Sequence, residues 1–260
     1  MALHLLRKTP GNQTVAQKMA EELGSGVIFL HMPVTRIDHS RRGNCVVHTQ
    51  SGRNFECRKV IVSIPTSLYH RITFSPLLPE KKVILSENTT TGCYTKMIYV
   101  FSEPWWHKAC LSGVLDSEKG PIIFSRDTSI PQDNQWSITC FLTGDKGRNW
   151  SKLPRASRHQ QAWDQFSQSL GQFTSVPLPA NTLEMEWTKE AFFPGAPCPI
   201  TTPGVHSAVE GEIATPVGDV HFVGTETSRE WRGYMEGAIR SGLRGGAEVV
   251  GRLEDTTSRL

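Results

Sequence analysis

The chain has 260 residues, of which 38% are hydrophobic and 20% are charged, and these values are typical of a soluble globular protein with one large domain or two small ones. The net charge of +3 is small and spread along the chain, so no basic segment indicates a nucleic-acid partner. No apolar run is long enough to span a membrane, so we expect no transmembrane segment.

The first third of the chain predicts one helix followed by short strands. Apolar residues at helical spacing predict a helix over Gln13–Leu23, and glycines follow it. The next segments are short and apolar, and turn residues separate them, which is typical of strands. We expect strands at 27–30, 34–38, 45–49, 55–57 and 59–65.

The middle of the chain predicts further strands and helices. Residues 93–101 alternate in character, as a half-buried strand does. Ala162, Phe166 and Leu170 share one face of a helix predicted over 155–170. The other predicted elements are a helix at 81–87, strands at 120–124, 135–142 and 183–187, and a loop at 191–204.

The most informative stretch runs from Gly224 to Gly237 and reads GTETSREWRGYMEG. It joins the apolar strand 220–223 to a helix by a tight turn. Glycines let a backbone approach a flat ligand closely, and a helix N-terminus favours a ligand that becomes anionic. An ordinary strand–turn–helix unit with glycine packing is the alternative interpretation. The expected core face of the helix consists of Met235, Ile239, Leu243, Ala247 and Val250.

This stretch resembles the C-terminal flavin-binding segment of the flavin monoamine oxidases, through its GTET and W-x-G-Y-M-E-G pieces. The resemblance extends in weaker form over nearly all of the chain. It implies an α/β fold of the mixed α+β type, with an incomplete FAD/NAD(P)-binding-like domain and a mixed-sheet substrate domain. The implied divisions are 1–85 and 191–253 for the FAD-binding domain, 86–190 for the substrate-binding domain, and 254–260 for a polar tail.

The resemblance also implies which residues bind the flavin. At the turn these are Gly224, Thr225, Glu226, Gly233, Tyr234 and Met235. Thr225 and Glu226 would lie near the ribityl and pyrophosphate part of FAD, and the later three at the pyrimidine end of the ring. Val34 would contact the cofactor through its backbone, and Trp187 would lie against the ring. The alternatives are an ordinary strand residue for Val34 and a core tryptophan for Trp187.

Two residues are the catalytic candidates that the resemblance implies. Lys96 matches the family lysine that reaches the flavin N5 through a water and assists reoxidation by dioxygen. A charged side chain inside an apolar strand costs free energy unless it is paired, which makes this lysine unusual. The alternative is that Lys96 points to solvent from the polar face of its strand. Tyr234 matches a tyrosine that forms one wall of an aromatic cage around the amine.

The loop before the turn departs from the animal members of the family. There a Cys-Tyr pair supplies the covalent flavin attachment and the second cage wall, whereas this chain has Ala196 and Pro197. We therefore expect noncovalent FAD, which resembles the fungal branch. Cys198 is two positions away and is not expected to attach the flavin. Phe192 or Phe193 is a candidate for the missing ring.

A second departure is the absence of the G-x-G-x-x-G turn that holds the pyrophosphate in this family. The resemblance covers only the C-terminal part of the family fold, and roughly half of a typical family chain has no counterpart. The strands that this half contributes would otherwise complete the sheet, so we expect unpaired strand edges and exposed apolar faces.

The expected function is FAD-dependent oxidation of a primary amine by dioxygen to an aldehyde, ammonia and hydrogen peroxide. One alternative is a catalytically inactive fragment or truncated gene product of such an oxidase. Another is a polyamine or L-amino-acid oxidase. The residues specify neither the amine nor the oligomeric state.

The cysteines and the C-terminus bear on location. None of the six cysteines forms a C-x-x-C pair or a Cys/His cluster, so we expect no metal site and thiols in a reducing compartment. The final tripeptide, Ser258, Arg259 and Leu260, is a conservative variant of the S-K-L peroxisomal address. We expect a peroxisomal protein, or otherwise a cytoplasmic one.

Overall fold

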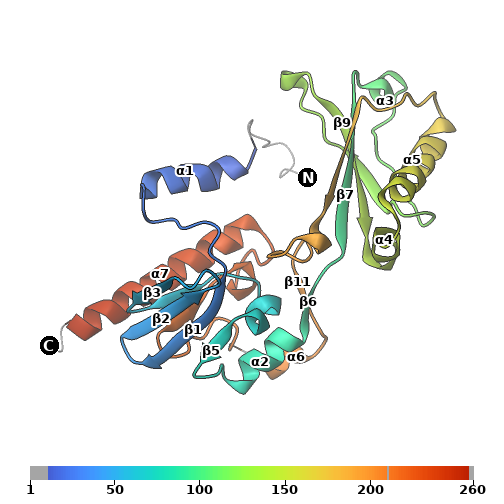
Figure 1. Cartoon of the computed structure of the whole chain (residues 1–260). Coiled ribbons are helices and arrows are strands. Elements are labelled where there is room, and N and C mark those ends of the chain that lie inside the picture. The colour runs from blue at the N-terminus through green and yellow to red at the C-terminus, as the bar shows by residue number, and fades with distance from the viewer. Residues whose placement is uncertain (1–10, 210, 258–260) are drawn as a thin grey trace.

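The computed structural model describes residues 11–209 and 211–257, with the side chains of 255–257 left out. The fold is mixed α/β, as expected. Two four-stranded sheets lie at opposite ends of the molecule, and Figure 1 shows the chain passing between them. Residues 258–260, which carry the expected peroxisomal address, lie outside the described residues.

The first sheet has the strand order β3-β2-β1-β5. Its strands are β1 (Val34–Arg41), β2 (Asn44–Thr49), β3 (Asn54–Cys57) and β5 (Thr73–Ser75). The first three form an antiparallel meander, which confirms the predicted strands at 34–38, 45–49 and 55–57. β5 pairs with β1 in parallel. Ile37 and Phe74 from this sheet pack against Phe222 in one core.

The strand predicted at 27–30 does not form. These residues are irregular and exposed, although all four are apolar. A strand requires a neighbour for its backbone hydrogen bonds, and none of the described strands pairs with this segment. Phe29 instead packs on Phe55 of β3, with ring centroids 5.1 Å apart. The guanidinium of Arg53 lies over both rings.

A separate parallel pair consists of β4 (Val60–Val62) and β12 (Val220–Phe222). β4 is shorter than the strand predicted at 59–65, since the chain turns into the 3₁₀ helix η2 (Thr66–Arg71). Parallel strands are ordinarily covered on both faces and belong to larger sheets. Within the described residues this sheet has two strands only.

The two edges of this parallel pair differ. The outer edge of β12 is covered, because Val217 exchanges two backbone hydrogen bonds with Val220 and Arg244 donates to the Phe222 carbonyl at 2.8 Å. On β4 the backbones of the first and last residues bond toward β12, so the N–H and C=O of Ile61 between them point to the opposite edge. The Ile61 side chain is 43% exposed. The open edge is therefore that of β4.

The second sheet has the order β10-β7-β9-β8 and is antiparallel throughout. Its strands are β7 (Tyr94–Phe101), β8 (Phe124–Asp127), β9 (Trp136–Thr143) and β10 (Asn181–Glu186). Alternate residues of β7 are buried, as the sequence predicts. The strand predicted at 120–124 instead starts at Phe124, and the one predicted at 183–187 ends before Trp187.

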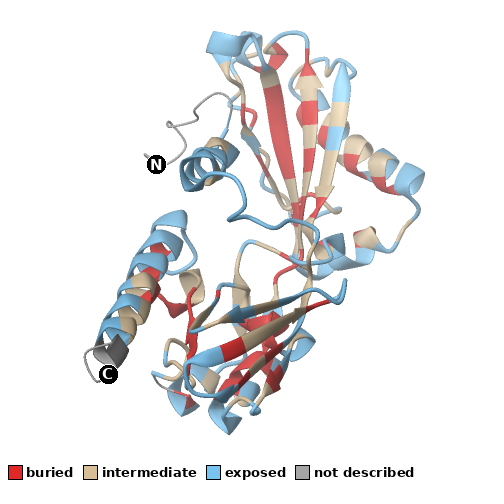
Figure 2. Cartoon of the chain, turned by 60° about the vertical axis from the view of Figure 1, so that its left-hand side comes forward, coloured by how far each residue is buried: buried red, intermediate tan, exposed pale blue. Residues whose placement is uncertain are grey.

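One face of the second sheet carries the main core. Figure 1 shows α4 (Gly144–Ser151) and α5 (Arg155–Gly171) on the same side of this sheet. Ala162, Phe166 and Leu170 of α5 are buried, which confirms the predicted helix face. They pack with residues such as Met97 and Tyr99 from β7. Buried and half-buried residues alternate along β7, whereas β9 has four consecutive buried residues, as the upper sheet of Figure 2 shows. The face of β7 opposite this core is therefore less covered.

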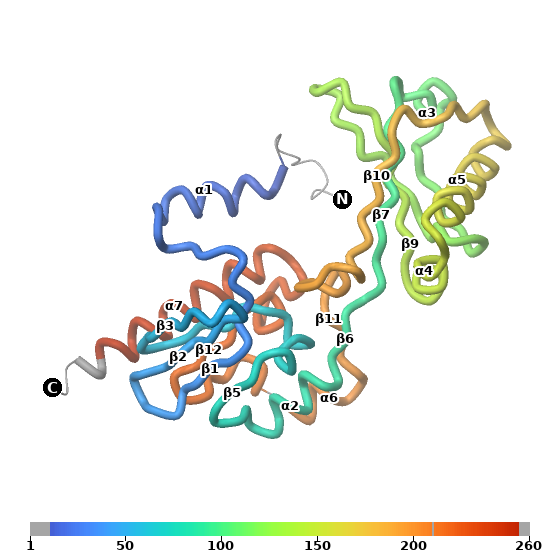
Figure 3. Tube along the Cα trace, viewed as in Figure 1, coloured from blue at the N-terminus to red at the C-terminus, as the bar shows by residue number. Residues whose placement is uncertain are grey.

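Two short strands join the ends of the molecule. β6 (Thr89–Thr91) and β11 (Pro199–Thr201) pair in antiparallel fashion. Figure 3 shows the chain running outward through β6 into β7 and returning from β10 through β11. β11 lies within 191–204, the segment predicted as a loop. The prediction missed this strand because its short, Pro-containing sequence has no strand pattern of its own.

The two longest helices are α5 and the C-terminal helix. They are α1 (Gln13–Leu23), α2 (Glu80–Glu87), α3 (Trp105–Lys108), α4, α5, α6 (Val205–Ala208) and α7 (Met235–Thr257). The predicted helices at 13–23 and 81–87 are confirmed, although α1 has no buried residue. None of the helices in the described part of the chain is long and apolar enough to cross a membrane.

The predicted core face of α7 is wrong. Met235, Ile239, Leu243 and Val250 are all more than half exposed. The face that meets the protein instead carries Gly237, Ser241 and Gly245, four residues apart. A Cβ on Gly245 would lie 2.3 Å from the Val223 side chain, so glycine is needed for this close approach. The apolar stripe therefore faces outward.

Candidate functional site

The candidate site begins where the two parallel strands end. β12 leads into η5 (Thr225–Thr227), and β4 leads into η2. The side chain of Glu226 joins these two segments, since its Oε1 accepts a hydrogen bond of 3.2 Å from the Thr66 N–H. Ligands of open α/β sheets bind at the carboxyl ends of parallel strands, which is where this junction lies.

A single hydroxyl closes the turn between β12 and α7. Thr225 Oγ1 accepts a hydrogen bond of 2.7 Å from the Gly233 N–H and donates one of 3.0 Å to the Tyr234 carbonyl. Gly233 has φ of +87°, in the left-handed region. Gly224 N–H donates to Ser241 Oγ of α7 at 3.0 Å, so the start of the turn is fixed to the helix.

Gly237 fixes the position of the turn against α7. A Cβ at this position would lie 2.3 Å from the Trp231 carbonyl oxygen and 2.9 Å from Thr225 Oγ1. The carbonyl is backbone and cannot move aside as a flexible side chain can. The segment at Trp231 therefore folds tightly onto the helix start only because this position is glycine.

The aromatic residues of the turn are accessible. Tyr234 and Trp231 are each more than half exposed, and their rings are perpendicular with centroids 6.0 Å apart. Met235, which begins α7, is equally exposed. The turn thus offers an aromatic surface next to a helix N-terminus, which suits a flat ligand that gains negative charge.

Lys96 lies on the less covered face of the second sheet. It alternates along β7 with the buried residues Thr95 and Met97, and is half-buried itself. Its Nζ lies 5.7 Å from the ring centroid of Phe141 on β9. On the other side its register partner is Met185 of β10. Lys96 therefore lies on an inner strand of the sheet, between Phe141 of β9 and Met185 of β10.

Trp187 and Val34 approach from other elements. Trp187 starts the 3₁₀ helix η4 (Trp187–Lys189) directly after β10 and lies two residues beyond the strand partner of Lys96. Val34 is the first residue of β1, where it pairs with Thr49 and packs against the core of the first sheet. The structure brings the six turn residues into one unit and carries Val34, Lys96 and Trp187 on separate elements.

The loop that departs from the family pattern is anchored near the junction of β6 and β7. The Ala196 N–H donates to the Gly92 carbonyl at 3.0 Å, and Thr91 Oγ1 donates to the Pro194 carbonyl. Phe192 and Phe193, the candidates for the missing aromatic wall, are both exposed. In the described residues Cys198 is a free thiol, and no group of His, Cys, Asp or Glu forms a metal site.

The sequence did not indicate a polar network behind the turn. Arg244 donates to the Phe222 carbonyl, to Thr227 Oγ1 at 2.9 Å, and to Glu248 at 2.7 Å. Glu248 also accepts from His221 Nδ1 at 3.0 Å. Burial raises the pKa of Glu248, but the hydrogen bonds from His221 and Arg244 outweigh it and lower the pKa overall. The spacing of Arg244 and Glu248 allowed a helical ion pair, but the bonds to β12 could not be read from it.

The family model described as flavin containing amine oxidoreductase matches residues 3–250. The chain is 31% identical over 245 residues to amine oxidase [flavin-containing] A of Equus caballus, which covers 94% of this chain and 46% of that protein. It is 30% identical over 243 residues to a probable flavin-containing monoamine oxidase A of Dictyostelium discoideum, covering 94% and 53%. The chain therefore spans about half the length of these relatives.

The chain is also similar to solved structures of two amine oxidases, again over about half of their length. A variant of putrescine oxidase redesigned in cofactor binding superposes with a TM-score of 0.84 at 25% identity, covering 94% of this chain and 53% of that one. Cyclohexylamine oxidase from Brevibacterium oxydans superposes with a TM-score of 0.84 at 27% identity, with the same coverage. The overall fold of this chain is thus shared with about half of each of these enzymes.

Proposed function

Since the chain belongs to the flavin-containing amine oxidoreductase family, we propose that it forms the ring-binding and substrate-facing half of an FAD-dependent amine oxidase. The observation that carries this proposal is the turn closed by Thr225. It presents Tyr234 and Met235 at a helix N-terminus, beyond the carboxyl ends of two parallel strands. A helix N-terminus at this point stabilises a ring that becomes anionic on reduction.

The residues fit one end of FAD. The exposed side chains of the turn suit the isoalloxazine ring, whereas the sequence lacks the G-x-G-x-x-G turn for the pyrophosphate. The open edge of β4 and the outward apolar stripe of α7 support completion of the site by a βαβ segment outside this sequence. The alternative of an inactive fragment applies to the chain when that segment is missing.

The bound flavin would accept two electrons from the amine and pass them to dioxygen, giving an imine that water hydrolyses to aldehyde and ammonia, together with hydrogen peroxide. The aromatic face of Tyr234 would orient the amine nitrogen. Lys96 would hold a water beside the ring from the less covered face of β7. Ala196 has no nucleophile to attach the flavin, which supports noncovalent binding.

We expect FAD uptake to depend on the missing segment. The chain alone should stay colourless after incubation with FAD. A fusion carrying, before this chain, the N-terminal part of the Dictyostelium relative that the chain does not match should retain a visible flavin band. Denaturation should release that band, and the fusion should produce peroxide from an amine such as benzylamine, putrescine or cyclohexylamine. Visible absorbance and a coupled peroxidase assay check both points.

The outcomes separate the parts of the proposal. A fusion that retains FAD and reacts with none of these amines would contradict amine oxidation. Flavin that stays with the denatured chain would contradict noncovalent binding. Strong FAD retention by the chain alone would show that the turn and its surroundings suffice, and the role of the βαβ segment would then be wrong.

We further propose that the C-terminal tripeptide directs the protein to peroxisomes, where peroxide can be removed. A fluorescent protein that ends in residues 250–260 should gather in peroxisomes, and the same fusion without residues 258–260 should remain diffuse. Diffuse fluorescence of both fusions in co-localisation microscopy would disprove this address.

A further inference from the structure

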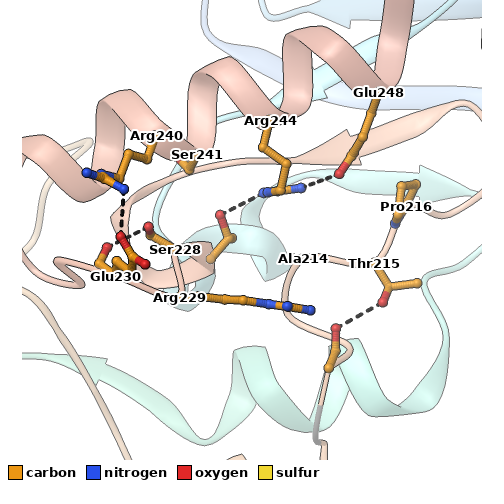
Figure 4. Close-up of a pocket in the computed structure, with 12 residues that line it drawn as sticks. Ala214, Thr215, Pro216, Ser228, Arg229, Glu230, Arg240, Ser241, Arg244 and Glu248 are labelled. Carbon is orange, nitrogen blue, oxygen red and sulfur yellow. Dashed lines mark hydrogen bonds and ion pairs between the residues drawn. The ribbon is translucent and has the colours of Figure 1, made fainter. Parts of the chain in front are cut away.

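A cavity of about 460 Å³ lies behind the turn, between α7, the segment 227–230 and the loop 211–216 (Figure 4). Its volume is within the range of sites for small organic molecules. Tyr234 and Met235, which face the proposed flavin site, are not among the residues that line it. The cavity is therefore distinct from the surface that is proposed to face the flavin.

The lining of the cavity is rich in cations. Three arginines, Arg229, Arg240 and Arg244, face two glutamates, Glu230 and Glu248, so the described lining has an excess of one positive charge. Arg240 is matched, because it forms ion pairs with Glu230 at 2.6 Å and with Glu236 at 2.7 Å. The excess positive charge therefore remains in the group formed by Arg229, Arg244 and Glu248.

Arg229 carries this excess. Figure 4 shows its side chain extended across the cavity, below Arg244 and toward the loop that contains Ala214 and Thr215. Among the residues that the structure describes, the Arg229 side chain has no hydrogen-bond or ion-pair partner. A planar guanidinium in this position is suited to bind a carboxylate or phosphate with two hydrogen bonds.

Arg244 lies on the opposite wall with part of its bonding capacity unused. Its two terminal nitrogens bond to Glu248, Phe222 and Thr227. Its Nε is buried and has no hydrogen-bond partner in the described part of the chain. Buried donors without partners are rare in folded proteins and often mark a place where a water or ligand belongs.

We propose that this cavity binds a small organic anion, with its carboxylate or phosphate between Arg229 and Arg244. Ala214 and Pro216 supply an apolar wall for the rest of the molecule. Because Arg244 also holds the Phe222 carbonyl and Thr227, the ligand stabilises the end of β12 from behind. None of the lining residues is among the turn residues that are proposed to bind the flavin, so the anion should bind whether or not FAD is present.

The test is calorimetric titration of the FAD-free chain with inorganic phosphate and, separately, with succinate, at constant ionic strength set by chloride. The expected result is saturable binding of one equivalent of one of the two anions. Arg229→Gln should weaken that binding about tenfold or more, because one of two guanidinium contacts is lost. Arg155→Gln is the matched control, since Arg155 is an exposed arginine on α5 with its side chain 74% accessible, and it should bind as the unmodified chain does.

Each outcome decides the proposal. Binding of phosphate but not succinate assigns a phosphate ligand, and the reverse assigns a carboxylate. Absence of saturable binding of either anion at millimolar concentration would overturn the site. Equal affinity in Arg229→Gln and in the unmodified chain would also overturn it. Arg229 is exposed, so the variant should keep its thermal midpoint in anion-free buffer, which separates lost binding from lost folding.

Discussion

Replacing Lys96 with methionine is expected to slow the reaction of the reduced flavin with oxygen about 100-fold, which is the effect of losing one preorganised polar group at a reacting centre. Methionine preserves most of the volume and the apolar contacts of the lysine stem, so the sheet should stay intact. The charge lies on the less covered face of β7, within 5.7 Å of the Phe141 ring centroid. Stopped-flow absorbance of the FAD-loaded fusion, reduced and then mixed with oxygen, measures this rate.

The control is Lys152→Met, because Lys152 is an exposed lysine at the end of α4. It should react with oxygen as the unmodified fusion does. Flavin retention should be the same in all three proteins. A Lys96→Met protein that reoxidises at the rate of the control would exclude a role in oxygen reactivity, and loss of flavin from it would assign Lys96 a binding role instead.

Gly237→Ala should lower the free energy of unfolding by about 3 kcal/mol, the upper part of the usual range for overpacking. The added methyl group would lie 2.3 Å from the Trp231 carbonyl oxygen, so the turn or the helix must shift. The same shift moves the Thr225 hydroxyl from its bonds to Gly233 and Tyr234. In the FAD-loaded fusion the variant should therefore also lose flavin affinity. Urea denaturation followed by tryptophan fluorescence measures the stability.

Gly242→Ala provides the matched comparison in the same helix. A Cβ there meets no atom within 4 Å, so alanine should stabilise the helix by about 0.5–1 kcal/mol. The two variants add the same methyl group to one helix, in crowded surroundings at Gly237 and in open space at Gly242. If Gly237→Ala proves as stable as Gly242→Ala, the tight packing of the turn on α7 is not required.

Elements whose partners lie within one sheet were predictable from sequence. β7 and α5 follow their apolar periodicity, and the buried face of α5 is the predicted one. The residues 27–30 are as apolar as a strand, yet no described strand pairs with them. Periodicity records which residues can be buried, whereas the structure of a segment also depends on which partner is present.

The last helix shows the same limit more sharply. The periodic apolar residues Ile239 and Leu243 define a real stripe, but the helix contacts the protein through Gly237, Ser241 and Gly245. Small residues give a weak hydropathy signal although they permit the closest packing. An exposed apolar stripe on this helix is consistent with a chain that spans only about half the length of its relatives.

The candidate site was predictable where it is contiguous in sequence. The turn from Gly224 to Met235 is one local motif, so its residues could be found without tertiary contacts. The network of His221, Arg244 and Glu248 could not, because the bonds that define it join a strand to a helix more than twenty residues away. The cavity beside that network likewise depends on the loop 211–216, which has no motif.

The paired strands β6 and β11 have a mechanical consequence. The chain crosses between its two ends through these strands, which are held together by three register pairs and lie side by side. Two antiparallel strands joined by hydrogen bonds resist twisting and sliding past one another, but they can bend together about an axis across them. We therefore expect any movement of the second sheet relative to the turn at 224–237 to be a hinge motion about one axis, with Gly92 and the loop around Ala196 at its pivot.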